Sequence, residues 1–331
     1  MINILFCNAG RRGKLLLNAK HSLADRGNIV ATSQTEYSPA LYCADKRYLT
    51  SAIEDPAYID CVLSICKREH INAITTLIDP EISILAKHRD LFEELGIHVF
   101  TPDKQTADIC FNKFLFFEYL TECKIDTVRT FRNIASFRQS YNEKKIDFPV
   151  FIKPISGSGS VGARKVLSMS ELEWLCYEKA YDYIIQEFMD AEDIDADVYV
   201  DYYTNQAVSA FSKRKLETRI GGANKTISFK DDKLFKTIQN VVSKFKFYGT
   251  IDIDFFYKDG IYYVSEINPR FGGGYLHPYG VGLDFFNMMF NNINGKKNIP
   301  VFGNYEDGSI MMMYDDVVVL KSEEIMKYDK K

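Results

Sequence analysis

The sequence predicts an α/β domain built on an open parallel sheet, followed by an α+β region whose strands are mainly antiparallel. Three observations predict this arrangement. Buried strand patterns alternate with amphipathic helical patterns over roughly the first 100 residues. Further along the chain, many short strands follow one another with few long helices between them. The length of 331 residues suits about two domains, each large enough to bury a core.

The first region alternates strand and helix in order. Its strands are predicted at 3–8, 29–32, 73–78 and 98–101. Helical patterns occupy 15–23, 56–70 and 79–95, and Gly96 is expected to end the last of them. Helices that connect successive strands in this way are typical of a parallel sheet.

The second region begins with a single helical pattern at 105–123. The strands predicted after it lie at 127–131, 150–153, 163–167, 184–187, 195–201, 208–213, 250–257 and 261–268. No fixed-period repeat and no low-complexity stretch interrupts the region. We therefore expect an α+β arrangement here.

Composition excludes several classes of function. The 41 basic and 45 acidic residues leave a net charge of −4, which provides no field that would attract nucleic acid or an anionic membrane. No charge-free stretch approaches the roughly 20 apolar residues of a spanning helix. The seven cysteines are scattered and contain no Cys-x-x-Cys pair, which is typical of reduced core thiols. We expect a cytoplasmic protein that acts on small molecules.

A lysine at a strand end precedes a loop rich in glycine and serine. Lys153 ends the strand 150–153, and the loop that follows contains Ser156, Gly157, Ser158, Gly159, Ser160 and Gly162. Glycines let backbone N–H groups approach an anion, serine hydroxyls add donors, and the lysine adds a fixed positive charge. The pattern favours a phosphate-binding loop, with a flexible hairpin loop as the alternative.

The strands 250–257 and 261–268 are separated by a short hairpin and should pair. Side chains alternate along a strand, so Asp252 and Asp254 share one face of the first strand, and Glu266 and Asn268 share one face of the second. Carboxylates that face each other repel unless a cation lies between them. Two carboxylates and an amide suit Mg²⁺ held jointly with substrate phosphates. The same pattern fits equally well a surface hairpin with a solvated polar face and no metal.

A third pattern is an apolar strand that turns into an acidic segment. Gln186, Glu187, Phe188 and Met189 end this strand, and Asp193 follows. An extended backbone can offer an N–H and a C=O to an adenine edge, and a following acid can accept from ribose hydroxyls. By itself this is a common arrangement.

Taken together and in this order, the three patterns resemble the ATP-grasp superfamily, and the strand pair is most similar to its carbamoyl-phosphate-synthase-like branch. The resemblance covers nearly the whole chain and includes one copy of the ATP-grasp unit. It implies a Rossmann-like domain that precedes the ATP-grasp unit at 1–103 and a two-lobed ATP-grasp domain at 104–331. The implied small lobe spans about 115–188, and the large lobe spans about 189–320.

The resemblance also implies roles for residues that match the family's motifs. The expected ATP-binding residues are Lys113, Lys153, Ser156, Gly157, Ser158, Gly159, Ser160, Gly162, Gln186, Glu187, Phe188, Met189 and Asp193. The expected magnesium ligands are Asp254, Glu266 and Asn268, and the expected catalytic residues are Arg270 and Lys153. One departure is Ala191, where members often carry glycine, which leaves open whether Glu192 or Asp193 contacts the ribose.

These roles imply an ATP- and Mg²⁺-dependent ligase that activates a carboxylate as an acyl phosphate for attack by an amine or a thiol. Two magnesium ions are expected, with Mn²⁺ as a substitute, and the resemblance favours a homodimer. Two other functions are considered: a split carbamoyl-phosphate-synthase-like subunit and a non-catalytic nucleotide-binding regulator. The sequence leaves the substrates open, together with the roles of Arg11, Arg12, Asp79, Glu81, Arg219 and His277.

Overall fold

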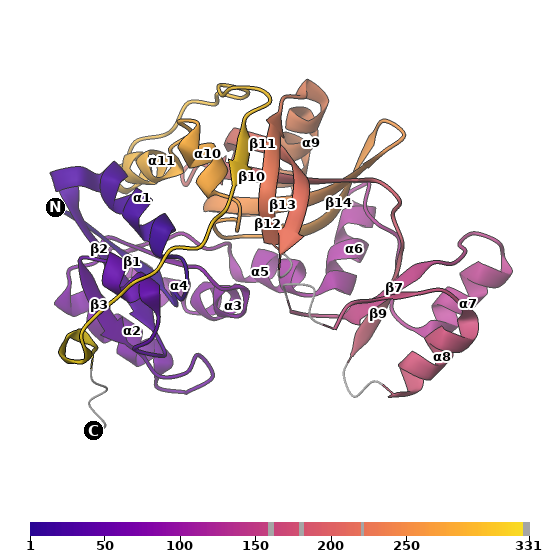
Figure 1. Cartoon of the computed structure of the whole chain (residues 1–331), viewed down its shortest axis with the longest axis horizontal. Coiled ribbons are helices and arrows are strands. Elements are labelled where there is room, and N and C mark those ends of the chain that lie inside the picture. The colour runs from indigo at the N-terminus through magenta and orange to yellow at the C-terminus, as the bar shows by residue number, and fades with distance from the viewer. Residues whose placement is uncertain (158–161, 179–181, 220–221, 327–331) are drawn as a thin grey trace.

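The computed structural model of the chain describes residues 1–157, 162–178, 182–219 and 222–326. Three sheets organise them: a five-stranded parallel sheet, a four-stranded antiparallel sheet and a six-stranded antiparallel sheet. The parallel sheet lies at one end of the molecule, the four-stranded sheet at the other, and the six-stranded sheet between them (Figure 1). The predicted fold class is confirmed. The predicted limits of domains and lobes stay predictions.

The N-terminal sheet has the strand order β3-β2-β1-β4-β5. Its strands are β1 (Ile2–Cys7), β2 (Gly27–Ser33), β3 (Lys46–Leu49), β4 (Ala73–Thr76) and β5 (His98–Val99). The connecting helices are α1 (Gly13–Leu23), α2 (Tyr58–Arg68), α3 (Asp79–Lys87) and α4 (Arg89–Glu93). β1 is central because both of its faces are apolar: Ile4 and Phe6 pack into one core, and Leu5 and Cys7 pack into another.

Two differences from the sequence-based expectation occur in this domain. β3 was not predicted, since it is a short edge strand that begins with the exposed Lys46 and Arg47. The single helix expected at 79–95 is divided into α3 and α4 at His88, whose φ of −107° is not helical.

The helix expected at 105–123 is also two helices, α5 (Lys104–Phe111) and α6 (Lys113–Glu122). Asn112 separates them with extended backbone angles, and its side chain accepts hydrogen bonds from the N–H groups of Phe114 and Leu115. Asparagine is a favoured N-cap, so this residue ends one helix and begins the next. The break places Lys113 at the start of α6.

The four-stranded sheet has the order β6-β9-β7-β8. Its strands are β6 (Thr130–Phe131), β7 (Val150–Pro154), β8 (Arg164–Val166) and β9 (Tyr183–Glu187), and its helices are α7 (Ile134–Asn142) and α8 (Met169–Glu178). Val150, Ile152 and Ile185 pack against both helices in a small core of their own. This packing fixes the central strand β7, which carries Lys153 near its end.

The six-stranded sheet has the order β14-β13-β10-β11-β12-β15. Its strands are β10 (Glu192–Val200), β11 (Ala207–Arg219), β12 (Gly222–Phe229), β13 (Gly249–Lys258), β14 (Ile261–Asn268) and β15 (Ile310–Met312). β11 continues past the predicted end at 213, and β12 and β15 were not predicted. Alternate residues such as Ile194, Ala196 and Ile253 are buried in a core that includes α9 (Asp232–Val242) and α11 (Phe285–Ile293). The intervening positions carry acids.

After β15 the chain runs back to the N-terminal domain, where the Met326 N–H donates a hydrogen bond to the Tyr42 hydroxyl at 3.3 Å (Figure 1). Across the described ranges, no helix is long and apolar enough to cross a membrane.

Candidate active site

A cleft of about 750 Å³ is lined by residues of all three sheets or of the loops beside them. The predicted site residues that line it are Lys113, Lys153, Ser156, Gly157, Gln186, Glu187, Met189, Asp193, Asp254, Glu266, Asn268 and Arg270. Residues that are far apart in sequence therefore meet at one place. Phe188 and Gly162 are not among the lining residues, and Ser158, Gly159 and Ser160 lie outside the described residues.

Two lysines occupy the side of the cleft formed by β7 and the start of α6. The Lys113 Nζ donates to the Gly157 carbonyl oxygen at 2.5 Å, which joins α6 to the glycine loop. Burial lowers the pKa of Lys153 to about 8, against the opposing effect of Glu266 and with a further lowering by Lys113. A half-buried cation with a destabilised charge is suited to meeting an anionic ligand.

The acidic side of the cleft follows from strand register. Asp254 lies opposite Asp195 on β10 and Glu266 on β14, and Asp252 lies opposite Asp197 and Asn268. The pairing of Asp254 with Glu266 and of Asp252 with Asn268 confirms the shared face expected from alternation. Burial raises the pKa of Glu266, Asp254 raises it further, and Lys113 and Lys153 oppose the rise.

Lys215 lines the cleft; the sequence alone allowed its basic segment, with Arg214 and Arg219, to be either a loop over the phosphates or a solvated turn. Its Nζ lies 2.9 Å from Asp193 Oδ1 and also contacts Asp254, so one cation joins the expected ribose acid to an expected metal ligand. Burial lowers its pKa, but Asp254, Asp195 and Asp193 together raise it above the ordinary lysine value. The alternation of Lys213 and Lys215 along β11 is the signal that could have identified it.

A buried layer of charge lies beside these residues. Lys213 contacts Asp197 and lies 3.2 Å from Asp195 Oδ1, and all three side chains are almost fully buried. Burial and the nearby Asp195 raise the pKa of Asp252 well above the ordinary value. A Cβ at Gly272 would lie 2.5 Å from Asp197 Oδ1 and 2.8 Å from Asp252 Oδ1, so the chain passes this layer only as glycine.

Arg270 reaches the same cleft from the turn after β14. Its Nε lies 2.8 Å from Asp79 Oδ1, and its outer nitrogens lie 3.2 Å from Asp79 Oδ2 and 3.5 Å from Asp252 Oδ2. Burial would lower its pKa, but Asp79 and Asp252 raise it. Arg12 of the N-terminal domain donates to the carbonyl oxygens of Phe271 and Gly272 at 3.2 and 2.6 Å, which fixes the turn.

The expected adenine-binding strand presents its backbone more than its side chains. The Gln186 side chain donates to Thr130 Oγ1 at 2.9 Å, and the Glu187 N–H donates to the Arg129 carbonyl oxygen at 2.9 Å. Both of these donors are therefore already paired within the fold. The Phe188 ring packs at a tilt against Phe151, with centroids 5.7 Å apart; Phe151 lines the cleft and Phe188 does not.

Three residues with open roles do not line the cleft. His277 contacts Thr226 Oγ1 at 2.7 Å and Ser309 Oγ at 3.0 Å, and burial lowers its pKa to about 4. Glu81 is buried in the N-terminal domain, and Arg11 is exposed. The side chain of Arg219 lies outside the described residues.

The expected magnesium ligands lie on neighbouring strands but do not form a closed metal site. No group of three or more His, Cys, Asp and Glu side chains within the described ranges is arranged to hold a metal ion. Asp254 and Glu266 face each other across the strands, and Asn268 Nδ2 lies 3.4 Å from Asp254 Oδ2. Two carboxylates and an amide are too few for a closed site, and they fit an ion that keeps water and phosphate oxygens as ligands.

Two family models match the chain. Residues 4–100 match a model described as the PylC-like N-terminal domain, and residues 110–274 match a model described as the ATP-grasp domain. The chain therefore belongs to the ATP-grasp superfamily.

The relatives agree with the carbamoyl-phosphate-synthase-like branch expected from the sequence. The arginine-specific large chain of carbamoyl phosphate synthase from Bacillus subtilis is 21% identical over 249 residues, which are 72% of this chain and 23% of that protein. A D-alanine–D-alanine ligase from a Nitratiruptor species is 30% identical over 201 residues, which are 55% of this chain and 57% of the ligase. The chain thus matches less than two thirds of the length of either relative.

A solved structure shows the same fold over nearly the whole chain. N5-carboxyaminoimidazole synthetase from Staphylococcus aureus, complexed with ADP, superposes with a TM-score of 0.75 and 15% sequence identity. The match covers 94% of this chain and 82% of that protein. Both the N-terminal domain and the ATP-grasp lobes are therefore shared.

Proposed function

We propose that the chain is an ATP- and Mg²⁺-dependent ligase that joins a carboxylate to an amine. One observation carries the proposal: the cations Lys113, Lys153 and Arg270 and the oxygen donors of Asp254, Glu266 and Asn268 line a single cleft. The two relatives and the solved neighbour, which are named as a synthase, a ligase and a synthetase, support it.

The nucleotide would lie between the two antiparallel sheets. Lys113 and Lys153 would neutralise phosphate oxygens, the loop from Ser156 to Gly162 would cover them, and the backbone from Gln186 to Met189 would meet adenine. Asp193 would accept from the ribose once Lys215 releases it. Asp254, Glu266 and Asn268 would hold magnesium, with two ions proposed and Mn²⁺ as a substitute. The metal supplies charge neutralisation at the β- and γ-phosphates.

The proposed reaction has two steps. A carboxylate oxygen attacks the γ-phosphorus, the bond to the β-phosphate oxygen breaks, and ADP and an acyl phosphate form. The amine nitrogen then attacks the acyl carbon, phosphate leaves, and the amine loses a proton to give the amide. A thiol acceptor would give a thioester in the same way. Arg270 would stabilise the phosphoryl group in transit, and no side-chain nucleophile is needed.

A second candidate is a carbamoyl-phosphate-synthase-like subunit, which the match to the synthase large chain favours. Such a subunit would hydrolyse ATP in response to bicarbonate and would need a partner that supplies ammonia.

A non-catalytic nucleotide-binding regulator is the third candidate function. The clustered cations and metal ligands argue against it, because nucleotide binding alone does not need Arg270. We further propose that the chain is cytoplasmic and that it forms a homodimer. Light scattering tests the dimer.

The deciding experiment measures ADP release by the purified full chain with Mg²⁺ and a matrix of carboxylates and amines, with mass detection of condensed products. ADP release that needs one acid and one amine, together with their amide, supports the ligase. ADP release with bicarbonate alone supports the synthase-like subunit. Tight ATP binding without turnover in any combination supports the regulator and contradicts both enzymes.

A further inference from the structure

The arginine assigned to phosphoryl transfer is held by a different domain. Arg270 belongs to the turn after β14, whereas Asp79 is the first residue of α3 in the N-terminal domain. Two nitrogens of the guanidinium meet the two carboxylate oxygens of Asp79 at 2.8 and 3.2 Å. The hydrogen bond from one outer nitrogen to Asp79 Oδ2 and the ion pair between Nε and Asp79 Oδ1 together hold the guanidinium beside this carboxylate.

Some N–H groups of the Arg270 guanidinium are left for a ligand. One outer nitrogen of Arg270 donates to Asp79 Oδ2, and the other donates to the Phe271 carbonyl oxygen at 3.1 Å and lies 3.5 Å from Asp252 Oδ2. The Nε forms an ion pair with Asp79 Oδ1 that is not a hydrogen bond. A guanidinium has five N–H donors. The donors that remain, among the residues that the structure describes, include the second N–H of the outer nitrogen bonded to Asp79, so the bond to Asp79 sets where that donor points.

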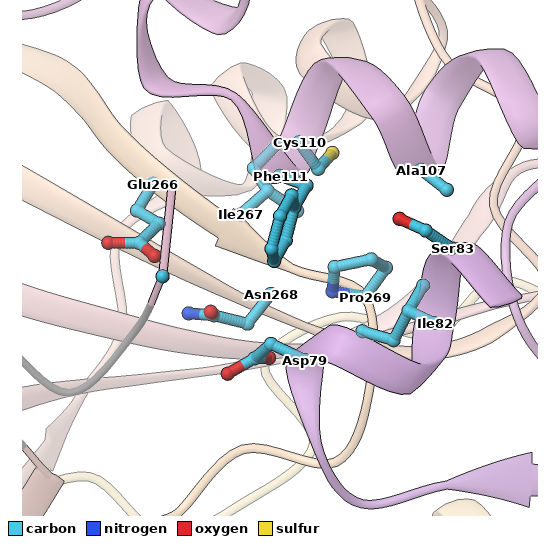
Figure 2. A pocket seen from close by; sticks show the side chains of 11 residues that line it. Asp79, Ile82, Ser83, Ala107, Cys110, Phe111, Glu266, Ile267, Asn268 and Pro269 are labelled. Carbon is cyan, nitrogen blue, oxygen red and sulfur yellow. The ribbon is translucent and has the colours of Figure 1, made fainter. Parts of the chain in front are cut away.

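Asp79 is itself rigidly placed. Two residues further along α3, the fully buried Glu81 accepts hydrogen bonds from Asn8 Nδ2 at 2.9 Å, from Thr76 Oγ1 at 2.5 Å and from the Tyr58 hydroxyl. These donors come from the ends of β1 and β4 and from α2, and they fix the start of α3 to the parallel sheet. Figure 2 shows Asp79 at this helix start, beside Asn268 and near Glu266.

We propose that Asp79 is a positioning residue that orients Arg270 toward the transferred phosphoryl group. The inference rests on the proposed ligase function. It makes the N-terminal domain part of the catalytic apparatus, although the nucleotide would lie between the other two sheets. The competing explanation is that Asp79 merely joins the domains.

Another contact between domains provides a matched control. The Tyr279 hydroxyl in α10 (Leu276–Gly280) lies 3.0 Å from Ser22 Oγ and donates to the Asn18 carbonyl oxygen at 3.2 Å in α1. It joins the same two domains and does not line the cleft. Tyr279→Phe therefore removes a domain contact and leaves Arg270 untouched.

The test compares Asp79→Asn, Asp79→Glu and Tyr279→Phe in the full chain, using the acid and amine found in the substrate screen. Asp79→Asn keeps the shape of the side chain but removes its charge, so kcat should fall about 100-fold, while KM for ATP changes less than about threefold. Asp79→Glu keeps the charge but displaces it by one methylene, so kcat should fall by a smaller factor. Tyr279→Phe should keep the kcat of the parent.

Three outcomes would overturn the inference. One is an unchanged kcat in Asp79→Asn, or in Asp79→Glu if the first variant does not fold. Another is an equal loss of kcat in Asp79→Asn and Tyr279→Phe, which would show a role in domain contact alone. The third is a parent that releases no ADP with any acid and amine. This outcome contradicts the proposed function as well, whereas an active parent with an unaffected Asp79→Asn variant removes only the positioning role.

Discussion

Two glutamates, the fully buried Glu81 in the N-terminal domain and the half-buried Glu266 in the cleft, differ in what surrounds them. Burial raises the pKa of both carboxyls. Glu81 has no exposed surface and accepts three side-chain hydrogen bonds. Glu266 lines the cleft, and its charged neighbours are Lys113, Lys153 and the opposing Asp254. Within the described part of the chain, the Glu266 carboxylate accepts no hydrogen bond.

The contrast distinguishes a carboxylate whose hydrogen-bond donors come from the fold itself from a carboxylate that is available to a ligand. A buried acceptor with a full set of donors stabilises the structure around it, and a ligand has nothing further to add. A carboxylate that faces another carboxylate, with lysines nearby, keeps its coordination capacity for a cation and its charge for catalysis. A raised pKa alone does not distinguish Glu81 from Glu266. The hydrogen-bonding and charged partners of each carboxylate do.

The largest expected effect is at Glu266. Glu266→Gln preserves shape but removes a charge that would hold magnesium, so turnover should fall at least about 100-fold, while affinity for ADP in the absence of metal stays unchanged. Steady-state ADP release and calorimetry measure the two quantities. Tm should rise, because the repulsion with Asp254 is relieved. Unchanged turnover together with a raised Tm would mean that this face is only a polar hairpin surface.

Removal of the Lys153 charge comes next. Lys153→Met should weaken ATP binding by about 2 kcal/mol, or roughly 30-fold, because a charge-assisted contact to phosphate is lost. The matched control is Lys165→Met in the same lobe, a lysine that does not line the cleft and whose Nζ lies 3.8 Å from the centre of the Phe188 ring. Calorimetry should find the affinity of the parent in the control. Equal affinity in both variants would contradict a phosphate role for Lys153.

The lowered pKa of Lys153, about 8, predicts a pH dependence. Below pH 8 the free protein already carries the charge that ATP needs. Above it the amine must take up a proton on binding, so ATP affinity should fall by up to about tenfold per pH unit between pH 8 and 10. Calorimetry in buffers of different ionisation enthalpy measures the proton uptake directly. Lys153→Arg should flatten the profile, and a flat profile in the parent would contradict the prediction.

The smallest effect on activity is expected at Glu81. Glu81→Gln replaces an acceptor oxygen by a donor inside a network of donors, so the free energy of unfolding should fall by about 1–3 kcal/mol. ATP affinity should remain that of the parent, and turnover should fall only a few-fold, through the start of α3. Chemical denaturation and ADP release measure both. A loss of turnover as large as that of Glu266→Gln would erase the distinction between the two glutamates.

The features that could be predicted from the sequence are those set by local pattern. Alternation along two consecutive strands placed Asp254 opposite Glu266 and Asp252 opposite Asn268, and the structure has that register. The fold class followed from the change in periodicity along the chain. The ATP-binding and metal-binding roles themselves stay predictions.

The parts that could not be predicted depend on contacts between distant segments. Asp79 and Arg270 are 191 positions apart, and nothing in either local sequence indicates that they meet. Lys215 lies in a strand whose length depends on pairing with β12, which was itself not recognised. The helix break at Asn112 was missed because apolar periodicity continues across it, and the capping chemistry of one asparagine decides the boundary.

The adjacent glycines of the turn after Arg270 differ in their tolerance of a side chain. Gly272 passes the buried acids too closely to carry one, whereas a Cβ at Gly273, which lines the cleft, would meet no atom within 4 Å. A side chain introduced at position 273 would therefore occupy cleft space without disturbing the charges beneath position 272.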